Sequence, residues 1–260
     1  MHYDFSLPVF SPRFIPVWRR NFLVWKKLAG SSILGNIADP MIALMAFGYG
    51  LGSLLPQVGG VPYIQFLADG TVCMSTMNAA TFESLYSAFS RMHIQRTWDG
   101  IMNAPVALED VLLGELTWAA SKAFLSGLAI MIVVWIMGLA GGPQSVLILG
   151  VVVLIGGAFA GIGLVVNALS NAYDTFTYYF TLVITPMGFL SGVFFPVAQL
   201  PAWLQVLAHA LPLYHAIGLA RPLLLGQWPG QPLLHVTVLL AYAAIGTYVA
   251  IVLTRRRLLT

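Results

Sequence analysis

The sequence predicts an all-α integral membrane protein with six transmembrane helices. Its mean hydropathy is +0.86 and only 8% of its residues are charged, compared with roughly 25% in soluble domains. Several apolar stretches reach the ~20 residues needed to cross a bilayer, and none alternates like a barrel strand. Since backbone amides in lipid must be satisfied internally, each stretch is expected to be helical. The expected spans are 33–55, 63–89, 116–139, 146–169, 176–195 and 233–253.

The basic residues predict the topology, because they cluster at the two ends of the chain. Basic residues that flank spans stay on the cytoplasmic side, so both termini are expected in the cytoplasm and the number of spans is even. A seventh apolar stretch, 200–225, is interrupted by prolines and is therefore assigned to short external or re-entrant helices within 196–232. One membrane domain covers residues 1–260. The end clusters are Arg13, Arg19, Arg20, Lys26 and Lys27, then Arg255, Arg256 and Arg257.

A helix over residues 13–28 is expected to lie in the cytoplasmic membrane interface. Phe14, Trp18, Phe22 and Trp25 follow helical spacing on one side, and the basic residues occupy the other. This is typical of a helix whose apolar face enters the acyl boundary while its cations meet the headgroups. Anchoring to the membrane is the favoured role, and docking of a partner is the alternative.

The long inner connection, 91–115, mixes charged and apolar residues. Gly100 and Pro105 divide it into two short segments, the second beginning near Ala107. A loop this long among short connections indicates a function, and docking a soluble partner is the simplest one.

Two expected spans carry ionisable side chains at bilayer depth, where a charge costs roughly 2.5–3.5 kcal/mol on insertion scales. Glu83 near the inner end of span two and Lys122 near the inner start of span three are predicted to pair. The pair either joins two helices or takes part in gating the substrate. Lys122 could also extend its amine to the interface.

Span two also carries a polar stripe, because Asp69, Thr76 and Glu83 recur every seven residues. A second polar edge consists of Thr71, Ser75 and Asn78. Lipid would not tolerate this face, so it lines either a translocation pathway or a tight helix interface.

Three further features have ordinary interpretations. Asp39 before Pro40 and Asp174 before Thr175 are expected to cap helices. Tyr178 and Tyr179 at the inner end of span five fit an interfacial aromatic belt, or alternatively a surface on which a headgroup stacks.

The same sequence excludes several chemistries. It contains neither the phosphate loop GxxxxGK[ST] nor the GxSxG motif, so nucleotide hydrolysis is expected on another polypeptide. Because Cys73 is the only cysteine, a zinc site built from several cysteines is ruled out. The five histidines appear scattered, and no metal site or cofactor is expected. The basic residues flank spans, which favours membrane lipids as partners and excludes nucleic acid.

Two segments resemble a known family. NAPVALEDVLLGEL at 103–116 and SGVFFPVAQLPAWLQVLAHALPLYHAIGLARPLLLG at 191–226 are similar to permeases of type-2 ATP-binding-cassette exporters, especially the nodulation-factor (lipo-oligosaccharide) exporter permeases. The resemblance implies six spans, an interfacial helix, a coupling helix between spans two and three, and external helices before span six. It also implies a bacterial inner-membrane homodimer above cytoplasmic ATPase subunits that bind ATP and Mg²⁺.

The expected function is therefore ATP-driven export of an amphiphile, such as a lipo-oligosaccharide, a polysaccharide or glycolipid, or a drug. The alternatives are an ion-coupled secondary transporter and, less favoured, a membrane-embedded lipid-modifying enzyme. No catalytic residue is assigned. The resemblance assigns ATPase coupling to Trp98, Asp99, Ile101, Met102, Pro105 and Leu108. Pathway or gating roles are assigned to Asp69, Thr76, Glu83, Lys122, Tyr178 and Tyr179.

Overall fold

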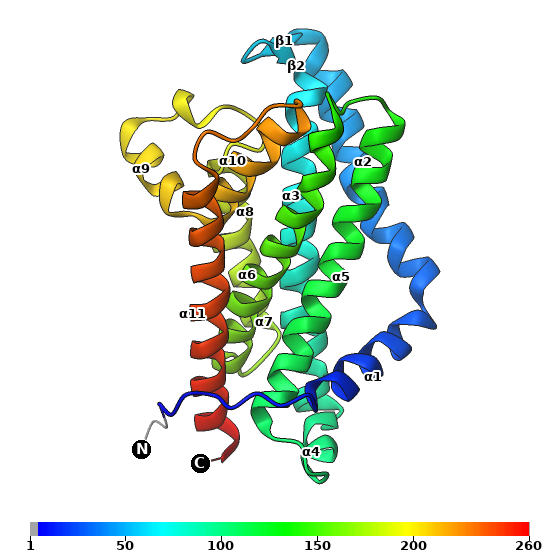
Figure 1. The fold of residues 1–260 in the computed structure, drawn as a ribbon, viewed down its shortest axis with the longest axis vertical. Coiled ribbons are helices and arrows are strands. Elements are labelled where there is room, and N and C mark those ends of the chain that lie inside the picture. Colours follow the sequence, from blue (N-terminus) through cyan, green and yellow to red (C-terminus); the bar gives the residue numbers. More distant parts are fainter. Residues whose placement is uncertain (1–4, 260) are drawn as a thin grey trace.

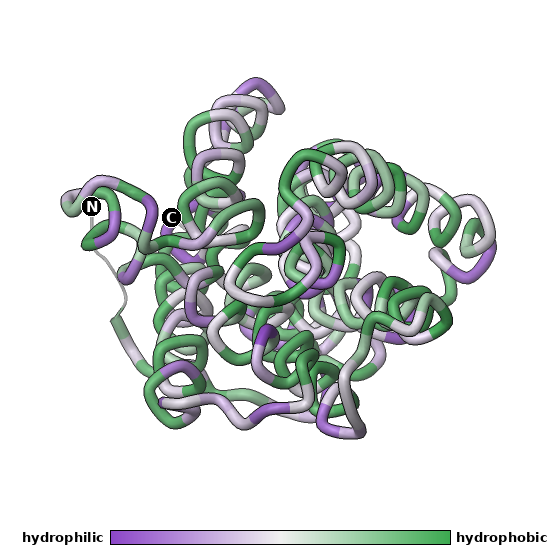
Figure 2. The backbone as a smooth tube through the Cα atoms, turned by 90° about the horizontal axis from the view of Figure 1, so that it is seen from above, coloured by the Kyte–Doolittle hydropathy of each residue, from purple (hydrophilic) through white to green (hydrophobic). Residues whose placement is uncertain are grey.

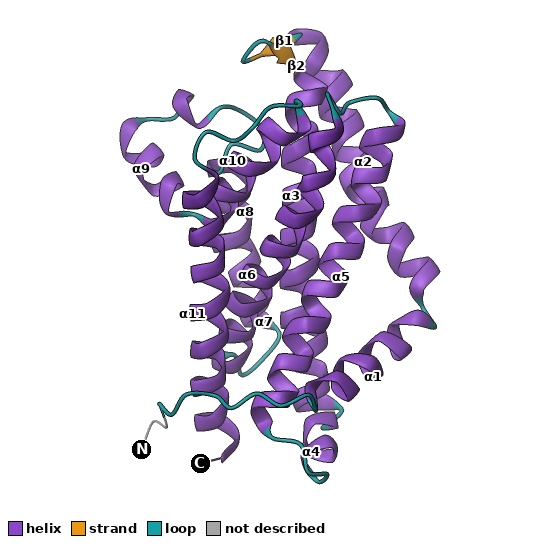
Figure 3. Ribbon diagram, viewed as in Figure 1, coloured by secondary structure: helices purple, strands orange, loops and turns teal. Residues whose placement is uncertain are grey.

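A computed structural model describes residues 5–259 as a bundle of helices (Figure 1). His2 and the chain ends Met1 and Thr260 lie outside the described residues. Hydrophobic residues occur on the helices all around the bundle when it is viewed along its length (Figure 2). Apart from one two-stranded hairpin, the described secondary structure is helical (Figure 3).

The first half of the bundle contains α1 (Phe14–Lys26), α2 (Ala29–Leu54), the hairpin strands β1 (Gln57–Val58) and β2 (Val61–Pro62), α3 (Tyr63–Phe82), the π-helices η1 (Glu83–Ser87) and η2 (Ser90–Ile94), α4 (Thr97–Met102) and α5 (Leu108–Ile136). The second half contains the 3-10 helix η3 (Pro143–Leu147), α6 (Ile148–Leu169), α7 (Asp174–Tyr179), the π-helix η4 (Phe180–Ile184), α8 (Thr185–Leu190), the 3-10 helix η5 (Val197–Gln199), α9 (Ala202–Ala210), α10 (Pro212–Leu224) and α11 (Pro232–Leu259).

Four helices in the described chain have the length and apolar composition needed to cross a bilayer: α2, α5, η3 with α6, and α11. The other two expected spans are also helical, but π-helical segments interrupt them. Residues 63–94 form one continuous helical run through α3, η1 and η2. Residues 174–190 form a second run through α7, η4 and α8.

The predicted boundaries of the inner connection were too wide. Helix continues to Ile94, and α5 already begins at Leu108, so the loop expected over 91–115 shrinks to 95–107 with α4 inside it. Hydropathy assigned the charged residues of this segment to a loop. In the structure Arg91, Glu109 and Glu115 lie on helices, where ion pairs compensate the burial of their charges. The run expected to end at 195 likewise stops at Leu190.

The two capping predictions were wrong. Helix α2 runs unbroken from Ala29 to Leu54 with Pro40 inside it, and Leu28 is its N-cap. Asp174 is the first residue of α7, where Tyr173 occupies the N-cap position and no side chain caps the helix. Asp39 is instead an exposed residue in the middle of a membrane-length helix.

Helix α6 lies in the bundle core, between α5 and α11. Its contact with α11 depends on glycine: a Cβ built on Gly161 would lie 3.1 Å from the carbonyl of Ala243, and one on Gly246 would lie 2.9 Å from Gly161. Small residues let the two helix backbones come this close. Such close packing favours helix association in a bilayer, where the hydrophobic effect does not drive helices together.

The two ends of the bundle differ (Figure 1). One end, here called the α4 end, holds α4 and both termini of the described chain. Arg255 of α11 pairs there with Glu109 at 2.7 Å and donates to the carbonyl of Ser6. The opposite end, here called the hairpin end, holds β1, β2, α9 and α10. A chain that crosses the bilayer an even number of times must have both of its ends on the same side, as they are here.

Helix α1 forms as predicted, but its aromatic face contacts protein. Trp18 and Phe22 stack with ring centroids 5.7 Å apart, and Trp25 lies 5.9 Å from Trp118 of α5. The indole of Trp18 donates to the hydroxyl of Ser121 at 3.1 Å. Helix α5 therefore covers part of this aromatic face, while all four aromatic side chains stay partly exposed; the location of α1 in the membrane interface stays a prediction.

Candidate functional site

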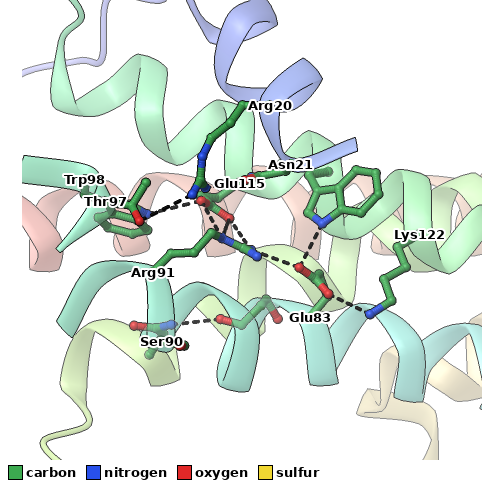
Figure 4. A network of polar contacts seen from close by, with 12 residues as sticks. Arg20, Asn21, Glu83, Ser90, Arg91, Thr97, Trp98, Glu115 and Lys122 are labelled. Carbon is green, nitrogen blue, oxygen red and sulfur yellow. Dashed lines mark hydrogen bonds and ion pairs between the residues drawn. The ribbon is translucent and has the colours of Figure 1, made fainter. Parts of the chain in front are cut away.

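The most concentrated polar structure is a network of charges at the α4 end, centred on Glu83 (Figure 4). Glu83 is 3% exposed at the junction of α3 and η1. Lys122 Nζ lies 2.7 Å from Glu83 Oε2, which confirms the predicted pair. Oε1 accepts from the indole of Trp118 at 2.8 Å and from Arg91 at 2.9 Å. This buried carboxylate is therefore satisfied by three donors.

Arg91 joins this carboxylate to a second one. Its guanidinium lies 2.9 Å from Glu83 and 2.5 Å from Glu115, and its Nε also donates to Glu115 at 2.9 Å. The negative charges of the two carboxylates are thus matched by the positive charges of Arg91 and Lys122, and buried ions need such partners.

Helix α5 supplies three members of the network from one face. Glu115, Trp118 and Lys122 have the spacing i, i+3 and i+7, which places them on one side of a helix. Trp98 of α4 completes the structure by donating its indole N–H to Glu115 at 3.1 Å. The network therefore ties α4 to the two membrane-length helical runs above it.

A cleft of about 360 Å³ opens beside the network, between α1, α5 and the run through η1 and η2. We call it the inner cleft. Arg20 of α1 reaches its wall and donates to Thr97 at 3.4 Å. The lining residues are Arg20, Asn21, Val24, Trp25, Glu83, Tyr86, Ser87, Ser90, Arg91, Gln95, Trp118 and Lys122. Charge, hydroxyls and aromatic surface therefore meet in one hollow.

Two further cavities continue from Lys122 toward the hairpin end. The first, about 240 Å³, shares Lys122 with the inner cleft, and the second, about 90 Å³, extends to Phe194. We call these two cavities the polar track. Its polar side chains come from three helices: Asn36 and Asp39 from α2, Thr71, Ser75 and Asn78 from α3, and Lys122 and Ser126 from α5. The second polar edge of span two, rather than its heptad stripe, lines this space.

The heptad stripe is buried against protein. Asp69 is 1% exposed and lies 3.2 Å from Arg221 of α10, whose guanidinium sits 3.8 Å above the Phe66 ring. Thr76 is buried and donates to the Val72 carbonyl of its own helix at 2.8 Å. Of the stripe, Glu83 lines the inner cleft, whereas Asp69 and Thr76 line neither this cleft nor the polar track. For Asp69 and Thr76, the geometry favours the interpretation that the stripe forms a helix interface.

The two tyrosines of the run 174–190 lie in different environments. Tyr178 is 66% exposed on the outer surface, as a residue of an interfacial belt would be. Tyr179 is partly buried against the core. Neither lines the inner cleft that Glu83 and Lys122 border.

The six predicted coupling residues separate into two groups. Asp99 and Pro105 are exposed, at the tip of the α4 end. Trp98 and Leu108 are buried, and Ile101 and Met102 pack partly buried against the same core. The backbone turns sharply before α4, where Arg96 adopts the left-handed conformation with φ of 49°. The two exposed residues are therefore held in place by the four that pack against the core.

Sequence reasoning missed several residues that belong to this charged network and to the polar track. Arg91 and Glu115 were treated as the ends of a loop, although the spacing of Glu115, Trp118 and Lys122 on one helical face could have revealed them. It also missed Asp39 on the polar track. The histidines expected to be scattered include three that meet at the hairpin end, where His215 Nδ1 lies 2.9 Å from His235 Nδ1 and His215 Nε2 contacts the His209 carbonyl.

Comparisons with known proteins show which family this sequence resembles. The profile of the family described as "ABC-2 type transporter" matches residues 13–225. "Nodulation protein J" of Sinorhizobium fredii is 46% identical over 258 residues, covering 99% of this chain and 98% of that protein. The protein of the same name from Rhizobium leguminosarum bv. viciae is 47% identical, covering 98% of each chain. "Inner membrane transport permease YadH" of Escherichia coli is 22% identical over 77% of this chain and 78% of that protein.

Proposed function

The chain belongs to the ABC-2 type transporter family as a membrane permease, and we propose that it carries an amphiphile out of the cytoplasm or inner leaflet. Candidate cargoes are a lipo-oligosaccharide, a polysaccharide or glycolipid, and a drug. The observation that carries the proposal is the inner cleft, which joins the polar track at Lys122. An amphiphile needs such a polar route beside an apolar surface.

We further propose six spans, with the α4 end in the cytoplasm of a bacterial cell and the protein in its inner membrane. The basic residues of α1 and of the end of α11 lie at the α4 end, which supports this orientation by the positive-inside rule. The two π-interrupted runs, 63–94 and 174–190, supply the spans that apolar length alone does not identify.

In this proposal, ATP and Mg²⁺ bind a separate ATPase subunit that docks on α4. Asp99 and Pro105 supply the exposed contact surface, and Trp98 passes displacement of α4 to Glu115 and Arg91. Arg91 also holds Glu83, so movement of α4 reaches the wall of the inner cleft through paired, buried side chains. Rigid helices then carry the change along the bundle.

A second copy of the permease would complete the translocation pathway. The polar track is bounded on one side by α2, where Asp39 is exposed at mid-helix. An exposed carboxylate at membrane depth is costly in lipid. A symmetric partner facing α2 would enclose the track and leave it hydrated. Lipids cover the remaining apolar surface.

Reversing the charge at Asp99 tests the docking surface. Asp99→Arg, co-expressed with the cognate ATPase, should insert normally but lower co-purification and substrate-stimulated ATP hydrolysis about tenfold, since interface contacts of 1–2 kcal/mol carry such factors. Gln57→Arg on the exposed hairpin is the matched control at the opposite end. Full stimulation in Asp99→Arg together with loss in Gln57→Arg would refute the assignment.

The family membership also bears on the ion-coupled alternative. A proton or sodium carrier would need Asp69 or Glu83 to exchange ions, but each is buried and paired with cations. Transport by the chain without any ATPase subunit would support that alternative over the one proposed.

A further inference from the structure

A separate cavity of about 830 Å³ lies at the hairpin end, where α9, α10 and α11 meet. We call it the head pocket. Its walls carry three imidazoles, two phenols and a carboxamide. The lining residues are His209, Ala210, Tyr214, His215, Gly230, Gln231, Leu234, His235, Val238 and Tyr242. None of them is Asp, Glu, Lys or Arg, so the described walls hold no fixed charge.

Hydrogen bonds set the protonation of the central imidazole pair. The His209 carbonyl can only accept, so His215 donates to it from Nε2 over 2.9 Å. A neutral His215 then accepts at Nδ1 from the N–H of His235 over 2.9 Å. Burial lowers the pKa of His215, which favours this neutral form. In the described structure, Tyr214 Oη and Nε2 of His235 have no hydrogen-bond partner, so polar atoms remain for a ligand.

An apolar groove continues from this pocket along the surface between α6 and α11. We call it the tail groove. It shares Val238 and Tyr242 with the head pocket. Its lining includes Gly246, whose added Cβ would lie 2.9 Å from the backbone of Gly161 on α6. The lining residues are Ile162, Val165, Val238, Ala241, Tyr242, Ile245, Gly246 and Val249.

The length of the tail groove matches one leaflet of a bilayer. From Val238 to Val249 α11 rises about 16 Å at 1.5 Å per residue, roughly half of the ~30 Å hydrocarbon thickness. With the spans and orientation proposed above, the uncharged head pocket lies at the membrane surface of the hairpin end, and the apolar groove extends from it to acyl-chain depth. The polar pocket matches the position of a lipid headgroup, and the apolar groove matches that of its acyl chain.

We propose that the head pocket and tail groove bind an amphiphile with an uncharged, hydroxyl-rich headgroup, that is, a glycosylated lipid. Phosphate headgroups are recognised by Arg and Lys, which the described walls lack. Sugar hydroxyls instead suit imidazole, phenol and carboxamide groups, which both donate and accept, and the rings of Tyr214 and His209, 4.6 Å apart, offer flat apolar faces. The site lies on the opposite flank from α2 (Figure 1), and it shares no lining residue with the inner cleft or the polar track.

Photolabelling of the full chain in phosphatidylcholine nanodiscs tests the site. The two probes are an alkyl glucoside and an alkylphosphocholine with the same diazirine-bearing chain. The glucoside should label peptides of 162–165 and 238–249 about fivefold more than the phosphocholine, which corresponds to one net hydrogen bond of ~1 kcal/mol. Excess unlabelled alkyl glucoside should remove this labelling. Equal labelling by both probes would identify ordinary annular lipid and overturn the proposal.

Two substitutions separate the tail from the head. Ala241→Phe fills the tail groove and should abolish the glucoside labelling, whereas Ala244→Phe, exposed on the same helix outside the groove, should leave it unchanged. Gln231→Ala in the exposed loop should reduce the preference for glucoside but keep labelling by the chain. Retained labelling in Ala241→Phe, or cross-links between two permease copies at these peptides, would contradict the site.

Discussion

The two ends of the α3 run each hold a buried carboxylate, yet their surroundings differ. At the hairpin end, Asp69 meets one cation, Arg221, which lies over the Phe66 ring and also donates to the backbone carbonyls of Phe66 and Gly192. At the α4 end, Glu83 meets two cations and an indole at the wall of the inner cleft. The first arrangement fastens α10 to α3, and the second connects the bundle to α4.

This difference shows why burial of a charge does not by itself identify a pathway. Both carboxylates lie on the same heptad stripe and both are almost fully buried. Only the one that borders a cavity and is linked to an exposed element has a route to both substrate and partner. The comparison therefore predicts distinct consequences for substitutions at the two ends.

Removing Arg91 should have the largest effect on stability. Arg91→Met leaves Glu83 and Glu115 buried beside each other with one fewer cation, and breaking a buried pair costs about 3–5 kcal/mol. We expect a loss near the top of that range in the free energy of unfolding, measured in mixed detergent–SDS micelles. Arg91→Lys, which restores one charge without the bidentate geometry, should recover part of it. Equal stability of Arg91→Met and the unaltered chain would contradict the network.

Substitution at the hairpin end should cost less stability and spare function. Asp69→Asn leaves Arg221 with the carbonyls of Gly192 and Phe66 and with the Phe66 ring, so we expect about 3 kcal/mol, the lower end for a broken buried pair. Substrate-stimulated ATP hydrolysis per folded complex should stay unchanged. A selective loss of stimulation with normal stability would instead place Asp69 in the pathway.

Lys122 should show the smallest effect on stability and a clear effect on transport. Lys122→Met leaves Glu83 with Arg91 and Trp118, so the cost in the free energy of unfolding should be about 1.5–2 kcal/mol, the lower end for a hydrogen bond to a charged group. Because Lys122 joins the inner cleft to the polar track, efflux from loaded vesicles should fall even when the amount of folded complex is matched. Unchanged efflux would reduce the pair to a structural link. Lys122→Arg, which keeps the charge, serves as the control.

Much of the fold could be predicted from the sequence. Apolar length and the clustered basic ends identified the helical regions and placed the chain termini at a common end, because hydropathy and charge act locally along the chain. Pairing of Glu83 with Lys122 was also predictable, since antiparallel neighbours bring similar depths together. The boundaries near Arg91 and Leu108 were not, because hydropathy assigns charged residues to water and cannot see the partners that neutralise them.

The sequence by itself determined that this is a helical membrane permease with an inward polar face on its second span. Only the tertiary structure decided which polar edge faces a cavity: Thr71, Ser75 and Asn78 line the polar track, whereas Asp69 and Thr76 are enclosed. It also brought His209, His215 and His235 together from three helices. The physical reason is that periodicity fixes the face of one helix, while the neighbour that meets this face depends on how all the helices fit together.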